Sequence, residues 1–337
     1  MTAKKRPWQE TAGIHLMVGF HGTNMDEELK FIIRDFKIGG IVLFRRNIES
    51  PEQLRTLLTE AQSFAGETLG RSLLVSIDQE GGPVQRLEAP FTQLPSARDL
   101  ALEGPEAIVH WTTRAADELR QTGIQINLAP VLDVFSGTPS HFMEARCLDS
   151  NPQKVAALGK IWIQTLQKNG VSATAKHFPG LGLAESDPHH FAPVIHWTDD
   201  ASMQRDLLPF REAIRDGVHC VMTSHALYPY LDPDWPATLS PKINNEWLRG
   251  KLGFEGVLLS DDMDMAAVSQ RYSWAETVFQ GMASSIDFFL LCQQTENIAP
   301  FHQALSSALE GDTNLQDLHY RSLQRIERLL QRHVREC

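Results

Sequence analysis

The sequence predicts an α/β fold with one domain, most simply a closed (β/α)8 TIM barrel. Short apolar runs alternate with longer amphipathic segments eight times, which is typical of parallel strands with helices outside the sheet. The length of 337 residues suits a single barrel, and 42% hydrophobic residues are enough for a large core. An open, doubly wound sheet is the alternative. It is disfavoured because no glycine-rich phosphate-binding motif follows any apolar run.

The boundaries of the predicted elements come from apolar runs, helix-start signals and glycines. Ser50-Pro51 and Asn151-Pro152 each pair a capping side chain with a proline suited to the first turn, so two helices begin there. We expect one domain over residues 1–337, with the barrel at about 12–310 and a final helix at about 314–335. The predicted strands span residues 14–20, 40–44, 73–77, 126–131, 171–175, 219–223, 256–259 and 286–291, and the predicted helices span 26–37, 51 onward, 105–121, 151–169, 202–216, 241–252, 274–283, 296–309 and 315–333.

Composition and charge narrow the class of partner. With 31 Lys and Arg against 42 Asp and Glu, the net charge is −11, which argues against non-specific binding to nucleic acid or to an anionic membrane. No stretch approaches the roughly 18 apolar residues of a membrane helix, and the first residues do not form a secretory signal.

The four cysteines are scattered, with Cys220 and Cys292 on apolar strands as expected core residues. A cytoplasmic protein with reduced thiols is the simplest interpretation.

The stretch from Ala175 to Val194, AKHFPGLGLAESDPHHFAPV, has the composition of a functional loop. It follows an apolar strand and holds several titratable groups, and Gly180 and Gly182 are expected to give its backbone freedom to move. Other predicted strands are also followed by polar residues, which in a barrel gather at one face. These residues are Arg45, Arg46, Asn47, Asp78, Glu80, Arg86, Asp133, Arg146, Lys176, His177, Asp187, His189, Ser224, His225, Ser260, Asp261, Asp262 and Asp264.

A polar cleft with this content fits two kinds of chemistry. Aspartate and arginine side chains make the charge-assisted hydrogen bonds that recognise sugar hydroxyls and amides, and a carboxylate at a strand end can attack an anomeric carbon when a second group protonates the leaving oxygen. The same aspartates and histidines would suffice to bind a metal ion. No HxH or HExxH spacing appears, however, and the adjacent His189 and His190 would point in opposite directions in an extended segment.

Six motifs resemble the β-N-acetylhexosaminidases of glycoside hydrolase family 3, and the resemblance runs from about Gly13 to the eighth strand. It implies a TIM barrel, a retaining double-displacement mechanism, no metal and no cofactor. The motifs are DQEGGPVQR, NLAPVLDV, KHFPGLGLAESDPHH, VMTSHALYPYLD, PATLSP and LRGKLGFEGVLLSDDMDM.

The resemblance also implies roles for particular residues. Asp261 falls on the family's nucleophile, and Asp187 and His189 fall on its acid/base pair, in which the aspartate orients the imidazole and stabilises its charged form. The positions that match sugar-binding residues are Asp78, Arg86, Arg146, Lys176 and His177. For Asp262 we expect a structural or electrostatic role, and for Glu80, Asp133, His190, His225 and Asp264 a hydrogen-bonded structural role.

Three departures from the family pattern concern the loops. Leu181 replaces a histidine of the usual KHFPGHG, Pro188 stands where the dyad motif has serine, and residues 143–148 read MEARCL rather than roughly IGxRSF. These changes leave the nucleophile and dyad in place, and they bear on loop geometry and on the group that leaves with the sugar.

The expected activity is that of a cytoplasmic exo-β-N-acetylglucosaminidase that removes terminal GlcNAc from muropeptides during peptidoglycan recycling. A GlcNAc-containing muropeptide or chito-oligosaccharide is the expected partner, without nucleic acid or membrane, and the protein is expected to be a monomer or weak homodimer. A β-glucosidase or a phosphorylase on the same barrel is one alternative. A non-catalytic sugar-binding protein is another, although binding alone requires none of Asp261, Asp187 and His189.

Overall fold

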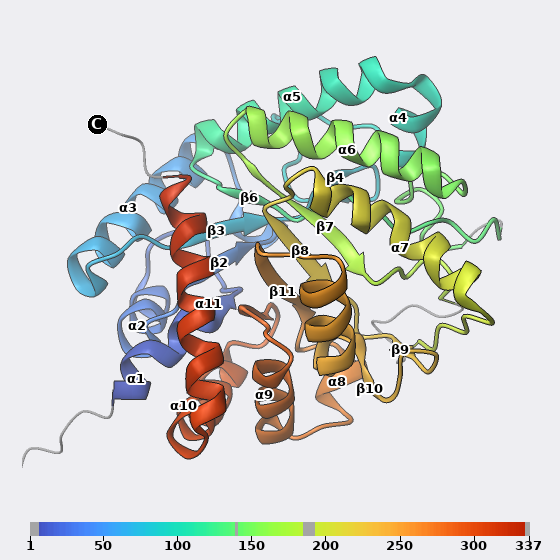
Figure 1. The fold of residues 1–337 in the computed structure, drawn as a ribbon. Coiled ribbons are helices and arrows are strands. Elements are labelled where there is room, and N and C mark those ends of the chain that lie inside the picture. The colour runs from blue at the N-terminus through green and yellow to red at the C-terminus, as the bar shows by residue number, and fades with distance from the viewer. Residues whose placement is uncertain (1–6, 139–140, 185–192, 334–337) are drawn as a thin grey trace, which may run out of the picture.

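The computed structural model describes residues 7–138, 141–184 and 193–333, and within them the predicted barrel is confirmed. Its strands are all parallel and run in the closed order β1-β12-β11-β8-β7-β6-β3-β2 (Figure 1). β1 pairs with β2 through Met17 and Gly40 and with β12 through Leu16 and Phe289, so the open-sheet alternative is wrong. The barrel strands are β1 (Leu16–Val18), β2 (Gly40–Leu43), β3 (Leu74–Ile77), β6 (Ile126–Asn127), β7 (Ser172–Phe178), β8 (Cys220–Thr223), β11 (Val257–Asp262) and β12 (Phe288–Leu291).

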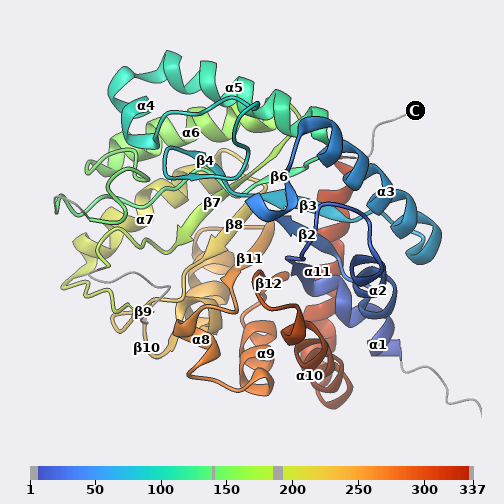
Figure 2. The same ribbon diagram turned by 180° about the vertical axis from the view of Figure 1, so that it is seen from behind.

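Helices surround the barrel in both views (Figures 1 and 2). The predicted capping residues are confirmed, because the Ser50 hydroxyl accepts the Gln53 N–H at 3.1 Å and the Asn151 side chain accepts the Lys154 N–H at 3.0 Å. The helices are α1 (Pro7–Thr11), α2 (Glu27–Phe36), α3 (Pro51–Leu69), α4 (Ala97–Glu103), α5 (Pro105–Thr122), α6 (Pro152–Lys168), α7 (Asp200–Arg215), the π-helical segment Lys242–Lys251, α8 (Ala266–Ser269), α9 (Trp274–Ala283), α10 (Ile298–Gly311) and α11 (Thr313–Gln331). No described helix is long and apolar enough to cross a membrane.

Two strands extend further than their apolar runs. The prediction that Lys176, His177 and Asp261 follow their strands is wrong, because β7 continues to Phe178 and β11 to Asp262. Backbone pairing persists there, from Phe178 to Thr223 of β8 and from Asp262 to Leu290 of β12. The apolar pattern ends earlier because the barrel interior becomes polar near its mouth. These three residues therefore lie on the rigid wall of the barrel rather than on loops.

Two segments expected to be loops contain small antiparallel hairpins. β4 (Gln79–Gly81) and β5 (Val84–Gln85) follow β3, and β9 (Leu227–Tyr228) and β10 (Asp232–Pro236) follow β8. The first hairpin turns at Gly81 and Gly82, both at positive φ, with 95° and 55°. A side chain at Gly81 would meet the Pro95 carbonyl oxygen at 2.3 Å, so glycine is required there.

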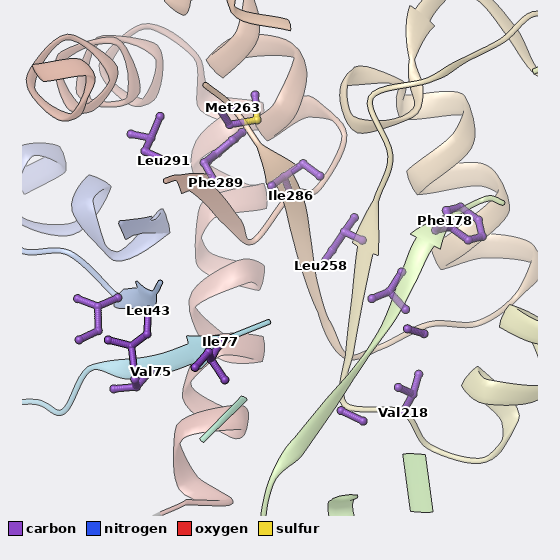
Figure 3. Close-up of a cluster of buried hydrophobic side chains, with 14 of the residues drawn as sticks. Leu43, Val75, Ile77, Phe178, Val218, Leu258, Met263, Ile286, Phe289 and Leu291 are labelled. Atoms are coloured by element: carbon purple, nitrogen blue, oxygen red, sulfur yellow. The ribbon is translucent and has the colours of Figure 1, made fainter. Parts of the chain in front are cut away.

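The strand residues divide into two apolar layers by their alternation. One cluster combines Leu43, Leu258 and Phe289 with helix residues and forms the layer between barrel and helices (Figure 3). The other contains Val42, Leu259 and Phe288 and fills the barrel interior, together with Ile326 and Leu329 of α11. Cys220 and Cys292 belong to this inner layer, as expected. α11 thus closes the barrel at the end where the strands begin.

A buried histidine pair helps to hold α11 at this end. Nδ1 of His15 donates to the carbonyl oxygen of Asp287 at 2.8 Å, so in the neutral ring Nε2 accepts from Nδ1 of His319, also at 2.8 Å. Nε2 of His319 then has no hydrogen-bond partner among the described residues. Burial lowers the pKa of His319 to about 3 and also lowers the pKa of His15. Both rings are therefore neutral in the folded state at neutral pH.

This pair makes the stability depend on pH in a definite direction. When the pKa of a histidine is lower in the folded than in the unfolded chain, its contribution to stability is complete above about pH 6.5. This contribution is lost as the pH falls toward the folded pKa, because the unfolded chain then binds a proton that the folded chain does not. We expect the free energy of unfolding to fall from pH 7 to pH 5, and His319→Gln to remove up to about 2 kcal/mol of that fall. Urea unfolding at both pH values measures this, and an unchanged difference in the variant would contradict it.

Candidate active site

The barrel mouth holds a cavity of about 510 Å³ that is lined by residues from several strand ends. Inner-layer residues such as Val42, Leu128 and Leu290 belong to its lining. Asp187 and His189 lie outside the described residues. The structure brings every other predicted site residue to this cavity, namely Asp78, Arg86, Arg146, Lys176, His177 and Asp261.

Five of the lining residues form one network of paired charges. Lys176 lies between two carboxylates, with Nζ 2.8 Å from Oδ1 of Asp78 and 2.6 Å from Oε1 of Glu80. Arg146 binds Glu80 in a bidentate manner, with Nε to Oε2 at 2.9 Å and Nη2 to Oε1 at 2.8 Å. Arg86 donates to the second oxygen of Asp78 at 3.1 Å. Each buried charge in the network is therefore compensated by a hydrogen-bonded partner.

This compensation keeps the network ionised. Burial alone would raise the pKa of Glu80, but Arg146 and Lys176 outweigh it and lower the pKa to about 2. Burial opposes ionisation of Asp78 in the same way, and Lys176 with Arg86 holds the pKa of that carboxyl well below its usual range. The two carboxylates raise the pKa of Lys176 despite burial. The cavity wall thus carries fixed charges of both signs, suited to binding a ligand with many hydroxyls.

A second pair orients the His177 ring. Nδ1 of His177 lies 2.7 Å from Oδ2 of Asp133, a carboxylate that is fully buried, and the His177 N–H also reaches Asp133 at 3.2 Å. Both carboxylate oxygens of Asp133 accept backbone N–H groups, so Nδ1 of His177 is the donor in this pair. Nε2 of His177, on the cavity lining, is then available to a ligand hydroxyl. Asp133 also accepts the Leu181 N–H at 2.6 Å, which joins the start of the following loop to the same carboxylate.

Asp261 lies on β11 at the cavity lining, with Oδ1 accepting the Asp262 N–H at 2.8 Å. Burial would raise its pKa, but the neighbouring His177 and His225 imidazoles outweigh that effect, and the pKa of Asp261 is lowered. His225 is itself buried, and its Nε2 donates to the carbonyl oxygen of Asp262 at 2.9 Å. An ionised carboxylate at this position has the electron pair that attack on a carbon atom requires.

The adjacent Asp262 has the opposite electrostatic environment. Its Oδ1 accepts the backbone N–H groups of Asp264 at 3.0 Å and of Cys292 at 3.1 Å. Burial, followed by the negative charge of Asp264, raises the pKa of Asp262 to about 7. Asp264 in turn accepts the N–H groups of Gln293 and Gln294. The two residues therefore connect the end of β11 to the segment after β12, which is the hydrogen-bonded structural role expected for Asp264.

The base of the loop after β7 is fixed, contrary to the expectation for Gly180 and Gly182. Both glycines are buried, and a Cβ at Gly182 would lie 2.0 Å from the Val134 carbonyl oxygen. They are required by close packing rather than by freedom of movement. Leu181, where the family pattern has histidine, is an apolar residue of the core with 1% exposure. A leucine fits this apolar position, and residues 185–192 of the loop lie outside the described residues.

The altered segment around Arg146 is also accommodated by packing. Met143 and Cys147 are fully buried beside Val131 and Phe135, and Nη1 of Arg146 lies 3.5 Å from Sδ of Met143. Burial raises the pKa of the Cys147 thiol well above its usual value, so this cysteine is an unreactive core residue at neutral pH. Arg146 keeps its bidentate contact with Glu80 despite the changed neighbours.

Sequence reasoning assigned no binding role to Glu80 or Asp133, yet both support residues of the cavity. Glu80 lines the cavity and links Arg146 to Lys176, and Asp133 orients His177. The available signal was their position, because both closely follow predicted strands and lie within motifs of the family. Among the described residues, no three histidine, cysteine, aspartate or glutamate side chains are placed to hold a metal ion.

The charge network leads to a prediction for Arg146. Arg146 is expected to donate a hydrogen bond to the substrate. Arg146→Ala is therefore expected to lower kcat/KM by about ten- to a hundredfold, since losing a hydrogen bond that involves a charged group costs about 1.5–3 kcal/mol. Arg114→Ala, at an exposed site on α5, is the matched control and is expected to keep wild-type kinetics. Steady-state kinetics with thermal melting separates lost binding from lost folding, and an Arg146 variant with wild-type kcat/KM would contradict the prediction.

Comparisons with known proteins agree with this fold and cavity. The glycosyl hydrolase family 3 N terminal domain matches residues 10–329. A protein of Alkalilimnicola ehrlichii named Beta-hexosaminidase is 35% identical over 292 residues, or 84% of this chain and 82% of that protein. The solved β-N-acetylhexosaminidase of Beutenbergia cavernae superposes with a TM-score of 0.89 at 28% identity, covering 96% of this chain and 98% of that one.

A further solved structure belongs to a longer protein. The glycoside hydrolase family 3 β-N-acetylglucosaminidase of Paenibacillus sp. str. FPU-7 has a TM-score of 0.90 and 35% identity, covering 96% of this chain and 62% of that one. This chain therefore spans about three-fifths of the length of that solved relative. The match to the family domain, from residue 10 to residue 329, leaves little of the chain outside it, and we conclude that this protein is a glycoside hydrolase belonging to glycosyl hydrolase family 3.

Proposed function

We propose that the protein is a retaining exo-β-N-acetylglucosaminidase, a β-hexosaminidase that removes terminal β-linked GlcNAc. The observation that carries the proposal is the ionised Asp261 at the cavity lining, next to a wall of paired charges from Asp78, Glu80, Arg86, Arg146 and Lys176. A relative that is 35% identical over most of its length is named Beta-hexosaminidase, and solved relatives are named β-N-acetylglucosaminidase and β-N-acetylhexosaminidase.

The mechanism has two displacements at the anomeric carbon. The charged wall binds the sugar hydroxyls, and a carboxylate oxygen of Asp261 attacks the anomeric carbon while the bond to the leaving oxygen breaks. His189, oriented by Asp187, gives its proton to that oxygen. Water then attacks the anomeric carbon of the glycosyl-enzyme from the face that the leaving group occupied, opposite Asp261. His189 takes the proton from the water while the bond to Asp261 breaks. Two inversions give overall retention of configuration.

The neighbours of Asp261 support its part in this scheme. The lowered pKa of Asp261 keeps it ionised for attack. The pKa of Asp262 is raised to about 7, so this carboxyl group is partly protonated at neutral pH and repels Asp261 less. His177 presents Nε2 to the ligand because Asp133 holds the proton on Nδ1. The natural substrate that we propose is a muropeptide that ends in GlcNAc, in keeping with the sequence motifs of the resembled family.

Substrate selection tests the proposal directly. We expect p-nitrophenyl β-GlcNAc to be hydrolysed with a clearly higher kcat/KM than p-nitrophenyl β-glucoside, with water as the acceptor. Equal values would favour a β-glucosidase. Release of GlcNAc 1-phosphate on addition of phosphate would favour a phosphorylase, and binding of GlcNAc without turnover would favour a sugar-binding protein. Comparing a GlcNAc-terminated muropeptide with chitobiose then tests the proposed natural substrate.

A further inference from the structure

Two buried side chains outside the cavity contact the chain on both sides of residues 185–192. These are Asp206 of α7 and Tyr228 of β9, which we call the stem clamp. Tyr228 donates its hydroxyl hydrogen to the carbonyl oxygen of Gly180 at 2.9 Å, and its ring centroid lies 5.0 Å from that of Trp197. Asp206 accepts the Trp197 indole N–H at 2.8 Å. The clamp therefore joins Gly180, before this segment, to Trp197, after it.

The contact between Asp206 and Gly180 is one of close packing. A Cβ added at Gly180 would lie 2.8 Å from Cβ of Asp206, and Gly180 has φ of 132°, a conformation that side chains rarely adopt. Asp206 is fully buried and ion-paired to Arg205 at 2.7 Å. Burial raises the pKa of its carboxyl to about 6. The contacts with Arg205 and Trp197 offset the cost of burying this carboxyl group.

Backbone hydrogen bonds also hold the chain that follows residue 192. The Leu227 N–H donates to the Pro193 carbonyl oxygen at 2.9 Å, and the Leu227 carbonyl oxygen accepts the Ile195 N–H at 2.8 Å. β9 therefore holds residues 193–195 through Leu227, while its next residue, Tyr228, reaches Gly180. Both ends of the intervening segment are fixed to the same two-residue strand.

We propose that Asp206 and Tyr228 are positioning residues for the proton-transfer steps of the reaction. They hold both ends of the segment that carries Asp187 and His189, and so they set the reach of His189 toward the leaving oxygen and the attacking water. This inference rests on the proposed function, in which His189 moves the proton. Neither clamp residue lines the cavity, so they act through the chain they hold.

The Tyr228 hydroxyl provides a small and specific change. Tyr228→Phe removes two buried hydrogen bonds, the one to the Gly180 carbonyl oxygen and the one that the Ser224 hydroxyl donates to Tyr228 at 2.9 Å, and it keeps the ring that packs on Trp197. Tyr230→Phe is the matched control, since Tyr230 is exposed and its hydroxyl donates to Asp200 at 2.8 Å rather than to Gly180. The substrates are a GlcNAc disaccharide, whose leaving group needs a proton, and the 2,4-dinitrophenyl β-GlcNAc, whose leaving group does not.

Tyr228→Phe is expected to lower kcat/KM for the disaccharide about five- to tenfold, because the Gly180 carbonyl oxygen loses its side-chain donor, and to leave kcat/KM for the dinitrophenyl glycoside unchanged. Inhibition by free GlcNAc is expected to keep its wild-type constant. Tyr230→Phe should match the wild type on both substrates. An equal loss on both substrates, or no loss relative to Tyr230→Phe, would overturn the proposal. Trp197→Phe, which removes the indole N–H from Asp206, should give the same selective pattern.

The same pair of substrates separates this inference from the proposed function. If His189→Ala shows a selective loss on the disaccharide and Tyr228→Phe does not, the clamp proposal is wrong and the proposed role of His189 stands. If His189→Ala lowers both substrates equally, the proposed acid/base role is wrong, whatever the clamp variant shows.

Discussion

Asp261→Asn is expected to lower kcat by at least on the order of 10³-fold while leaving the fold intact. The amide oxygen still accepts the Asp262 N–H, so the hydrogen bond at Oδ1 is kept, but the amide is a poor nucleophile at an anomeric carbon. Thermal melting and binding of GlcNAc check that the barrel and its charged wall persist. Mass spectrometry with an activated fluoro-sugar should label the wild type at Asp261 and fail to label the variant.

Asp262→Asn is the matched control, because it makes the same chemical change one residue along β11. The asparagine oxygen can still accept the N–H groups of Asp264 and Cys292, so the connection between β11 and the segment after β12 survives. We expect a much smaller loss of kcat than in Asp261→Asn. An inactive Asp262 variant beside an active Asp261 variant would show that the nucleophile has been assigned one residue too early.

His189→Ala is expected to lower the rate on natural disaccharides far more than on activated glycosides. Cleavage needs a proton on the leaving oxygen, and attack by water needs a base. A dinitrophenolate leaves without a proton, so kcat/KM for its glycoside should be nearly unchanged. Its kcat should fall and the glycosyl-enzyme should accumulate, because the water step lacks its base. Rapid-mixing kinetics would show this as a burst of dinitrophenolate.

Two further measurements make the test of His189 decisive. Azide attacks without a general base and should restore part of the turnover of His189→Ala. Asp187→Asn should show the same pattern more weakly, since it disturbs the imidazole without removing it. Equal losses on activated and natural substrates would make His189 a binding residue. Glu185 would then be the next candidate for the acid.

Local signals in the sequence determined most of the fold. Ser50 and Asn151 cap their helices as predicted, because a capping hydrogen bond lies within three residues of its partner. The predicted helix over residues 274–283 coincides with α9, and each predicted strand overlaps one barrel strand, although β1 and β6 are shorter than predicted. Eight alternations of apolar strand and amphipathic helix predicted a parallel sheet covered by helices, and the missing glycine-rich phosphate-binding motif favoured the closed barrel over an open sheet. The short hairpins were missed because their few residues carry no comparable period.

The sequence also determined which part of each strand faces the site. Because parallel strands bring their carboxyl ends to one face, the polar residues that follow them were expected to share a cleft. The resemblance to the family then singled out Asp78, Arg86, Arg146, Lys176, His177 and Asp261 among them, and all six line the cavity. The flexibility expected of Gly180 and Gly182 was wrong, because their freedom depends on neighbours such as Val134 and Asp206 that come from other elements. A glycine needed for close approach and one needed for movement look the same in a sequence.

Only the tertiary structure decided how the charges are partnered. Glu80 is 66 residues from Arg146 along the chain, and Asp133 is 44 residues from His177. A buried carboxylate is stable only where an opposite charge or several donors reach it, and no local pattern records which distant residue does so. The same holds for Asp261 and Asp262, two neighbouring aspartates whose pKa values move in opposite directions. Burial favours a raised pKa at both, but the imidazoles near Asp261 outweigh it, whereas the charge of Asp264 adds to it at Asp262. Residue type and strand position were local properties of the chain, whereas charge state depended on contacts that only the closed barrel creates.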